Sequence, residues 1–245
     1  MRELNLNVEE FIYNTNKADN VDMLFQCFET AMGELGFDRL LLALMNDHPT
    51  LKKEAEHGVV KNYPDDWVNY YLSQEYDEID PVRTLSFART GAYTWDEIIE
   101  SKTLTEKQNL MFNQASEAKL YSGVGVALHG GGGAVAALGA ASSEKGVETN
   151  QFILDKVNLM AHQFYTCFWR LMGKDVFSLP VLLTDREQEV LKWSARGFTK
   201  ANIADRLNLS IHTIDSHIRN SMRKLDAKNI TSTVVKAINL GLIQI

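Results

Sequence analysis

Residues 183–245 constrain the fold of this chain more than any other segment, because caps and apolar spacing divide them into short helices. Thr184, followed by Glu187 three residues later, has the spacing of a capping box. Thr199 opens a second helix, and Ser210 caps a third one after a short turn. Two short helices, a tight turn and a longer helix that carries Arg and Lys predict a helix-turn-helix within an all-α unit of four helices.

The third of these helices is amphipathic. At about 100° per residue, one stripe is apolar and consists of Ile214, Ile218, Met222 and Leu225. The opposite side carries hydrogen-bonding and cationic groups without a carboxylate: His212, Thr213, Ser216, Arg219, Asn220 and Arg223. A solvated helix face is the alternative, but caps, angle and charge together favour contact with double-stranded DNA, whose grooves present acceptors and phosphates. Lys200 and His217 complete the set of residues expected at the DNA.

Charge is divided unevenly along the chain, which has a net charge of −7. Residues 176–245 hold 10 Lys and Arg against 6 Asp and Glu, a balance of +4, whereas residues 1–175 have a balance of −11. An acidic larger part joined to a basic smaller part suggests that only the smaller part meets a polyanion. A basic patch can equally be solvated surface, so charge alone does not decide between the two.

The segment 183–245 resembles the helix-turn-helix domain of LuxR-type bacterial transcription regulators. The residues that carry this resemblance are Glu187, Leu191, Gly197, Ile203-Ala204, Thr213-Ile214, His217-Ile218, Lys224-Leu225 and Gly241-Leu242-Ile243. The family often has Lys, Arg or Asn where this chain has Asp215, so a phosphate contact is not expected there; an aspartate can instead accept from a cytosine amino group. Helix-turn-helix dimers read paired half-sites of an operator, so a homodimer is expected, with the helix 151–171 and the final helix 231–240 as candidate contact surfaces.

The larger, N-terminal part has the pattern of a mixed α and β structure. Helical periodicity marks residues 21–35, 65–74, 105–119 and 152–171, and an apolar run at 39–45 predicts a buried strand. Two further strands, 123–128 and 134–141, flank four consecutive glycines, which predicts a hairpin. A phosphate-binding loop is disfavoured, because no Gly-Lys-Ser/Thr follows the glycines. These elements predict an α+β fold in which an antiparallel sheet is covered by helices on both faces, an α/β/α sandwich.

An unusual set of aromatic residues lies in the middle of this part. Tyr63, Trp67 and Tyr71 are four residues apart and could share one helix face; Asp80 with its following proline, and then Trp95, come after them. Aromatic rings that carry OH or NH groups near one carboxylate could line a pocket with polar anchors in an apolar body. The alternative is a core stripe, which is the commoner role of such spacing.

With Gly123 ahead of the glycine hairpin, this spacing resembles the autoinducer-binding domain of acyl-homoserine-lactone (quorum-sensing) LuxR-type regulators over about residues 20–170. The resemblance implies that Trp67 donates to the lactone carbonyl, Asp80 accepts from the ligand amide N–H, and Tyr63 donates to the acyl carbonyl. Tyr71 and Trp95 would wall the acyl chain or the lactone ring. These roles agree with the donors and acceptors that each side chain offers.

Two positions depart from that family pattern. Gly139 stands where the family often has a Ser or Thr hydroxyl facing the ligand, and Ala127 replaces a common proline before the hairpin. Losing the hydroxyl removes one possible anchor and enlarges the pocket locally. We therefore include Gly139 among the ligand-binding positions, and expect that a 3-oxo substituent is read by water or not at all, and that a longer or bulkier acyl chain could fit.

Enzymatic functions find little support in the residues. No nucleophile–base constellation, metal-ligand spacing or phosphate loop is present, so we expect no catalytic residues, no metal and no cofactor. Cys27 and Cys167 are too few for a disulfide framework or a zinc module, and no apolar run approaches the ~18 residues of a membrane span. A reduced, cytoplasmic protein without a signal peptide is the expectation.

Together these patterns predict a ligand-regulated, DNA-binding transcription regulator with a sensor domain at 1–171, a linker at 172–181 and a DNA-binding domain at 182–245. The expected partners are operator DNA, a small-molecule N-acyl-homoserine lactone and a second copy of the chain. An orphan regulator of the same architecture, binding another small amphiphile or nothing, is the alternative that Gly139 and Ala127 motivate. A lactone-degrading enzyme fused to a DNA-binding tail would need a metal or nucleophile that the sequence does not show.

Overall fold

A computed structural model describes residues 8–48, 51, 53–101, 103–173 and 182–245. The chain divides into two compact units: residues 8–130 and 135–173 belong to the first, and residues 182–245 to the second. Residues 174–181, most of the expected linker, lie outside the described residues. Among the helices that are described, none combines the length and the apolar character needed to cross a membrane.

The first unit is built on a five-stranded antiparallel sheet with the strand order β2-β1-β5-β4-β3. Its strands are β1 (Arg39–Leu44), β2 (Glu56–Lys61), β3 (Gly91–Thr94), β4 (Ser122–His129) and β5 (Val135–Ser142). The inner strands β1, β4 and β5 are buried over almost their whole length, as their Ala, Val and Leu content leads one to expect. β4 and β5 form the predicted hairpin through the short 3-10 helix Gly131–Gly133.

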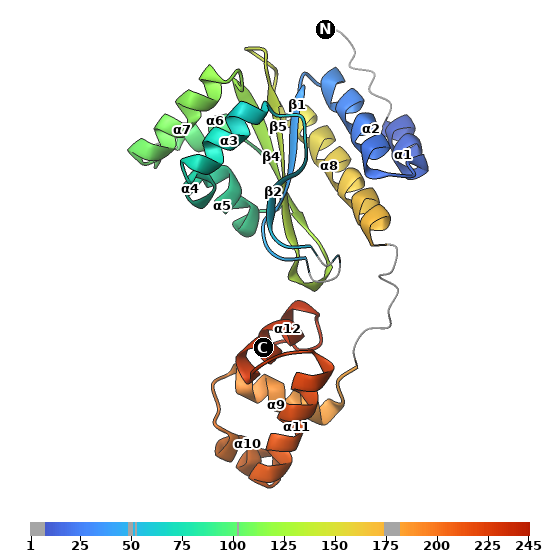
Figure 1. Ribbon diagram of the computed structural model, residues 1–245, viewed down its shortest axis with the longest axis vertical. Coiled ribbons are helices and arrows are strands. Elements are labelled where there is room, and N and C mark those ends of the chain that lie inside the picture. The colour runs from blue at the N-terminus through green and yellow to red at the C-terminus, as the bar shows by residue number, and fades with distance from the viewer. Residues whose placement is uncertain (1–7, 49–50, 52, 102, 174–181) are drawn as a thin grey trace. The chain divides into compact units, whose positions relative to one another are not determined.

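Helices cover both faces of this sheet, so the predicted α/β/α sandwich is confirmed (Figure 1). One face is covered by α1 (Val8–Lys17), α2 (Val21–Glu34) and α8 (Gln151–Met172), the other by α3 (Asp65–Ser73), α4 (Tyr76–Ile79), α5 (Pro81–Ala88), α6 (Trp95–Glu100) and α7 (Glu106–Glu117). The apolar side of α8 is buried, and Phe164 stacks on Phe28 of α2 with 4.6 Å between ring centroids. This layer is a packed core.

The helices predicted at 21–35, 65–74, 105–119 and 152–171 are present with ends shifted by at most two residues. The strands β2 and β3 and the helices α1, α4, α5 and α6 were not predicted from the sequence. β2 lies at an edge of the sheet and is only half-buried, so its sequence does not alternate cleanly between apolar and polar residues. β3 and α4 each have four residues, too few to create a periodic pattern.

The second unit consists of the four predicted helices: α9 (Asp185–Ala195), α10 (Lys200–Leu207), α11 (Ile211–Lys224) and α12 (Ile230–Asn239). Thr184 forms the predicted capping box with Glu187, and Thr199 and Ser210 cap α10 and α11. The predicted apolar stripe of α11 faces the interior, where Ile214 and Ile218 pack against α9 and α10. The helix-turn-helix is therefore confirmed in both its local and its packing details.

Candidate ligand cavity and DNA-binding surface

A cavity lies in the first unit between the sheet and the layer of α3, α5 and α7. Counting the open space at its mouth, it encloses about 650 Å³. All six residues predicted to bind a ligand line it: Tyr63, Trp67, Tyr71, Asp80, Trp95 and Gly139. The remaining lining is mostly apolar and comprises Leu41, Ala43, Val82, Met111, Phe112, Ala115, Ala137 and Leu138, together with His57 and Arg83. A largely apolar cavity with a few polar groups is the usual form of a small-molecule site.

Asp80 is the anionic centre of the cavity, and it is held rigidly by the chain around it. It caps α5: Oδ1 accepts from the Val82 N–H at 2.7 Å, while Oδ2 accepts from the Tyr71 hydroxyl at 2.8 Å. Burial raises the pKa of this carboxyl, whereas the hydrogen bonds from Tyr71 and Val82 oppose the rise. Burial, with the nearby Asp80 charge, also raises the pKa of the Tyr71 hydroxyl, which keeps Tyr71 a donor.

Tyr63 and Gly139 lie next to each other in the lining of the cavity. Tyr63 precedes α3, whose N-cap is Pro64, so it does not share a helix face with Trp67 and Tyr71 as the spacing suggested; the turn nevertheless brings all three to one cavity. Burial raises the pKa of the Tyr63 hydroxyl, so this group remains protonated. A Cβ built on Gly139 would lie only 3.3 Å from the Tyr63 Oη, so the tyrosine hydroxyl takes up the space that a side chain would need, and the expected local enlargement of the pocket is not found.

The two tryptophans form apolar walls that also belong to the core. Trp67 and Trp95 are buried together with Tyr71, Tyr76 and Met111, so the expected roles of core stripe and pocket lining coincide in the same rings. The Nε1 of Trp95 is buried without a hydrogen-bond partner among the described residues. Gly123 places the ring, because a Cβ at that position would lie 2.4 Å from the Trp95 indole. Trp95 is thus pressed between β4 and the cavity.

His57 and Arg83 are cavity residues that the sequence analysis missed. His57 comes from the unpredicted strand β2, and Arg83 from the unpredicted helix α5. The His57 ring stacks on Tyr71 with 4.9 Å between centroids and 13° between planes, and its Nδ1 lies 2.8 Å from Arg83 Nη1. Neither residue stands in a motif. Only the position of Arg83, three residues after Asp80, could have drawn attention to it.

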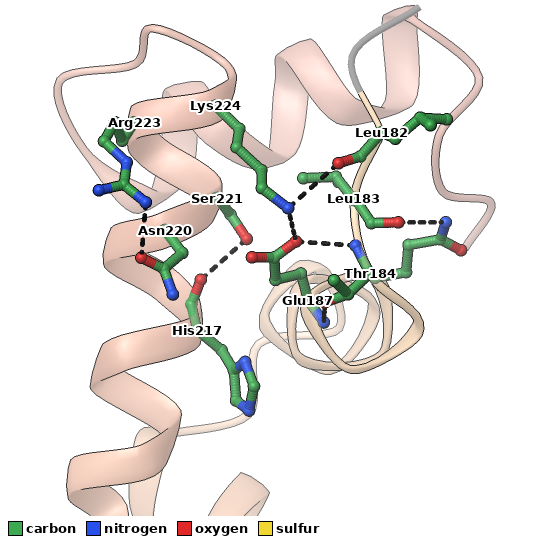
Figure 2. Close-up of polar contacts among 10 residues, drawn as sticks. Leu182, Leu183, Thr184, Glu187, His217, Asn220, Ser221, Arg223 and Lys224 are labelled. Atoms are coloured by element: carbon green, nitrogen blue, oxygen red, sulfur yellow. Dashed lines mark hydrogen bonds and ion pairs between the residues drawn. The ribbon is translucent and has the colours of Figure 1, made fainter.

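The predicted DNA-contacting residues lie on one helix, except for Lys200 at the start of α10. His212, Arg219 and Arg223 are exposed, while Thr213, Ser216, His217 and Asn220 are half-buried. Some already have intramolecular partners. The Ser216 hydroxyl donates to the His212 carbonyl at 3.0 Å. Arg223 donates to the Asn220 Oδ1 at 3.2 Å, as Figure 2 shows. The arrangement gives α11 an exposed basic face opposite its buried apolar stripe.

Lys200 is engaged by Asp215, the residue at which the chain departs from the family pattern. Its Nζ lies 2.5 Å from Asp215 Oδ1, so the pair joins the start of α10 to α11. A hydrogen bond from Lys200, together with its charge and those of Arg219 and His212, lowers the pKa of the Asp215 carboxyl. The charge of Lys200, predicted to contact DNA, is therefore balanced by Asp215. From the sequence, Asp215 was considered only as an acceptor for a cytosine amino group.

An ion pair between the buried Glu187 and the half-buried Lys224 ties α11 to α9 (Figure 2). Glu187 Oε2 accepts from Lys224 Nζ at 2.7 Å and from the Thr184 N–H at 2.7 Å, and Lys224 also donates to the Leu182 carbonyl at 3.1 Å. Burial raises the pKa of Glu187, but the bonds from Lys224 and Thr184 outweigh it, so the pKa is held below its usual value. The capping box predicted from sequence is thus also the anchor of the recognition helix α11.

A largely apolar cavity with a few polar groups in one unit and a helix-turn-helix in the other are typical of ligand-responsive transcription regulators. Residues 20–168 match the family described as "Autoinducer binding domain", and residues 181–237 match "Bacterial regulatory proteins, luxR family". The chain therefore belongs to the LuxR family of quorum-sensing transcriptional regulators.

Curated relatives agree with this assignment. The transcriptional activator protein SolR of Ralstonia nicotianae is 30% identical over 235 residues, which cover 92% of this chain and 94% of that protein. The transcriptional activator protein EchR of Dickeya chrysanthemi is 29% identical over 206 residues, 79% of this chain and 81% of its own length. These relatives are regulators rather than enzymes.

Solved structures share the fold. Escherichia coli SdiA aligns with a TM-score of 0.69 and 23% identity, over 97% of this chain and 98% of that one. A second structure of SdiA, in complex with octanoyl-rac-glycerol, aligns with a TM-score of 0.68 and 24% identity, over 96% of this chain and 94% of that one. At this level of identity the likeness shows the two-domain architecture alone.

Proposed function

We propose that this regulator senses an N-acyl-homoserine lactone in the cavity of its first unit. The observation that carries the proposal is the meeting of one buried carboxylate, Asp80, with the donors of Tyr63 and Trp67 in an otherwise apolar cavity. An acyl-homoserine lactone presents a matching set: one amide N–H, two carbonyl oxygens and an apolar chain. A buried amide without partners would cost about 1–3 kcal/mol per group, so matched groups favour this ligand class.

Each side chain has a role in this proposal. Asp80 accepts from the ligand amide, Trp67 donates to the lactone carbonyl, and Tyr63 donates to the acyl carbonyl. Tyr71, whose hydroxyl already holds Asp80, orients that carboxylate and forms an aromatic wall with Trp95. Gly139 lets the Tyr63 hydroxyl lie close to β5, because a Cβ there would be only 3.3 Å from its Oη.

A different amphiphile is the second candidate. Gly139 offers no hydroxyl to the ligand, and SdiA, which has the same fold, has been solved in complex with octanoyl-rac-glycerol. An acylglycerol has carbonyl and hydroxyl oxygens but no amide N–H. The two candidates therefore differ in whether Asp80 meets an N–H or an O–H donor.

In the second unit we propose that α11 enters the major groove of an operator with paired half-sites, bound by a homodimer. The exposed side of α11 carries His212, Arg219 and Arg223, which suit acceptors and phosphates. Ligand binding changes DNA affinity only if it favours one arrangement of the domains or of the dimer.

Thermal melting of protein prepared without ligand tests the sensor. A lactone at about 100 times its dissociation constant should stabilise the domain that binds it by about 2.7 kcal/mol. We expect a shift that peaks at one length in a series from about four to sixteen acyl carbons. Asp80→Ala should lose the shift with every lactone, whereas Glu78→Ala, which removes an exposed carboxylate outside the cavity, should keep it.

Monoacylglycerols of the same chain lengths form the second arm of the melting series. A shift with acylglycerols alone would establish the second candidate and exclude the lactone. If folded protein that binds DNA shifts with neither ligand class, the cavity is not a sensor for an acyl ligand and the proposal is wrong.

A further inference from the structure

The cavity contains two basic side chains that the proposed lactone contacts do not use, His57 on β2 and Arg83 on α5. Arg83 Nη1 and His57 Nδ1 are 2.8 Å apart. A guanidinium only donates, so Nδ1 must accept, and the neutral imidazole then carries its proton on Nε2. Burial, followed by the charges of Arg83 and Lys61, lowers the pKa of His57 to about 4, which agrees with a neutral ring at pH 7. Both side chains are therefore donors.

The pair is short of acceptors. Arg83 Nε is buried and has no hydrogen-bond partner among the described residues, and no carboxylate of those residues lies within 4.0 Å of the guanidinium to form an ion pair. The nearest carboxylate along the chain, Asp80, is already occupied by the Tyr71 hydroxyl and the Val82 N–H. The Arg83 guanidinium therefore has an unpaired N–H donor in a residue that lines the cavity, and an acceptor placed beside it would stabilise it.

The position of the pair relates it to the proposed amide anchor. His57 stacks on Tyr71, and the hydroxyl of the same Tyr71 donates to Asp80. The Tyr71 ring therefore links Asp80 to His57, while Arg83 lies three residues after Asp80 on α5, the helix that Asp80 caps. All three residues line the same cavity, so a ligand whose amide binds Asp80 would share that cavity with the pair and with the apolar side chains of Leu41, Val82 and Phe112.

We propose that Arg83 and His57 form a second polar subsite that binds an oxygen acceptor carried by the acyl part of the ligand. This inference rests on the proposed function, because Asp80 must anchor the acyl amide. It replaces our expectation that a 3-oxo substituent on the acyl chain is read by water or not at all in a cavity that lacks a hydroxyl at Gly139. The ligand class is therefore an acyl lactone with a keto, hydroxyl or carboxylate oxygen on its chain.

Calorimetric titration of the full chain with lactones of one chain length tests the subsite: unsubstituted, 3-oxo, 3-hydroxy and terminally carboxylated. We expect wild-type protein to bind at least one oxygenated lactone about tenfold or more tighter than the unsubstituted one, as hydrogen bonds to a charged group do. Arg83→Met should bring this ratio close to one. Arg89→Met removes an exposed arginine outside the cavity and should keep the wild-type ratio.

A second variant guards against misfolding of Arg83→Met. His57→Phe keeps an aromatic ring on Tyr71 and the charge of Arg83 but removes the imidazole donor, and it should reduce the ratio. If wild-type protein prefers the carboxylated lactone, the ligand forms an ion pair with Arg83. If it prefers the 3-oxo or 3-hydroxy lactone, the ligand oxygen accepts hydrogen bonds without an ion pair. Either preference supports the subsite.

Two outcomes would overturn the inference, and they differ in what they say about the proposed function. If wild-type protein binds all lactones equally, or if both variants keep its preference, Arg83 and His57 only tie β2 to α5, and lactone sensing stands. If wild-type protein binds no lactone at all, the subsite and the proposed function fail together.

Discussion

Asp215 is the single carboxylate in α11, and its partner Lys200 is the residue of α10 predicted to contact DNA. A free lysine beside DNA releases a counterion and strengthens binding, whereas a carboxylate repels phosphate. The ion pair therefore removes one cation from the proposed DNA surface, and it also holds α10 against α11. Which of these effects prevails can be measured.

Asp215→Asn should free Lys200 for a phosphate. We expect tighter operator binding at low salt and a dependence of log K on log salt that is steeper by about one. Fluorescence anisotropy with labelled operator over a salt series measures both quantities. Asp205→Asn removes an exposed carboxylate from α10 and leaves the pair intact, so its slope should stay near that of wild type. Weaker binding by Asp215→Asn would show that the carboxylate positions α11 or contacts a base.

Single residues also show how far the spacing of a motif reaches. The six predicted ligand residues could be found because their intervals match a family pattern, and all six line one cavity. Tyr63 nevertheless lies outside the helix that was expected to carry it. His57 and Arg83 could not be found in this way, since what makes them a pair is a contact between β2 and α5. Gly123 is a similar case. The reason that this position excludes a side chain is the packing of the Trp95 indole against it, which only the structure shows.

At the scale of elements, the recognition helix α11 depends on α9 through the ion pair of the buried Glu187 with the half-buried Lys224. The pKa of Glu187 is lower in the folded state than in an unfolded chain. A carboxyl with a depressed pKa adds stability above its unfolded pKa of about 4.3, and that stability is lost as the pH falls through the folded value. The pair therefore protects α11 at neutral pH and gives way in acid.

Glu187→Gln should remove part of the acid sensitivity of the second unit. Once the pH falls below the depressed folded pKa of Glu187, the stability of the variant should approach that of wild type, whereas at pH 7 it should be lower by about 1 kcal/mol or more, because Lys224 loses its partner. Urea unfolding followed by the fluorescence of Trp193 reports on this unit. Glu189→Gln breaks only an exposed pair with Arg186 and should shift the curve little. If wild type and Glu187→Gln differ in stability by the same amount at pH 7 and in acid, the role of Glu187 is refuted.

Elements were predictable where their signals are local. The helices α9, α10 and α11 have side-chain caps and apolar stripes in the sequence itself, and each was found. The four-residue helix α4 and the edge strand β2 lack such signals. Short elements are marginal alone and form because the rest of the domain packs on them, so tertiary contacts decide their existence.

For the whole molecule, the proposed dimer needs a surface that a second copy can cover. Phe152 and Leu159 are seven residues apart on α8 and are 61% and 45% exposed. Apolar residues at this spacing lie on one side of a helix and suit packing against another helix. Helix-turn-helix proteins read paired half-sites as dimers, so loss of a dimer contact on α8 would also weaken operator binding.

Leu159→Glu should weaken dimerisation by about tenfold or more, because it places a charge in an apolar contact. Sedimentation velocity over a range of protein concentrations measures the dimer dissociation constant, and operator affinity should fall with it. Phe87→Glu charges an equally exposed apolar residue on α5 and should leave the dimer intact. A dimer that survives Leu159→Glu unchanged would exclude this side of α8.

The sequence by itself determined the division into an acidic sensor and a basic helix-turn-helix, the caps and apolar stripe of α11, and the set of residues around Asp80. These are properties of neighbours along the chain, where 3.6-residue periodicity and capping chemistry act directly. Only the tertiary structure decided that Asp215 pairs with Lys200, that Lys224 pairs with the buried Glu187, and that His57 contacts Arg83. Such pairs join segments distant in sequence, and their energy depends on burial and separation, which packing alone sets.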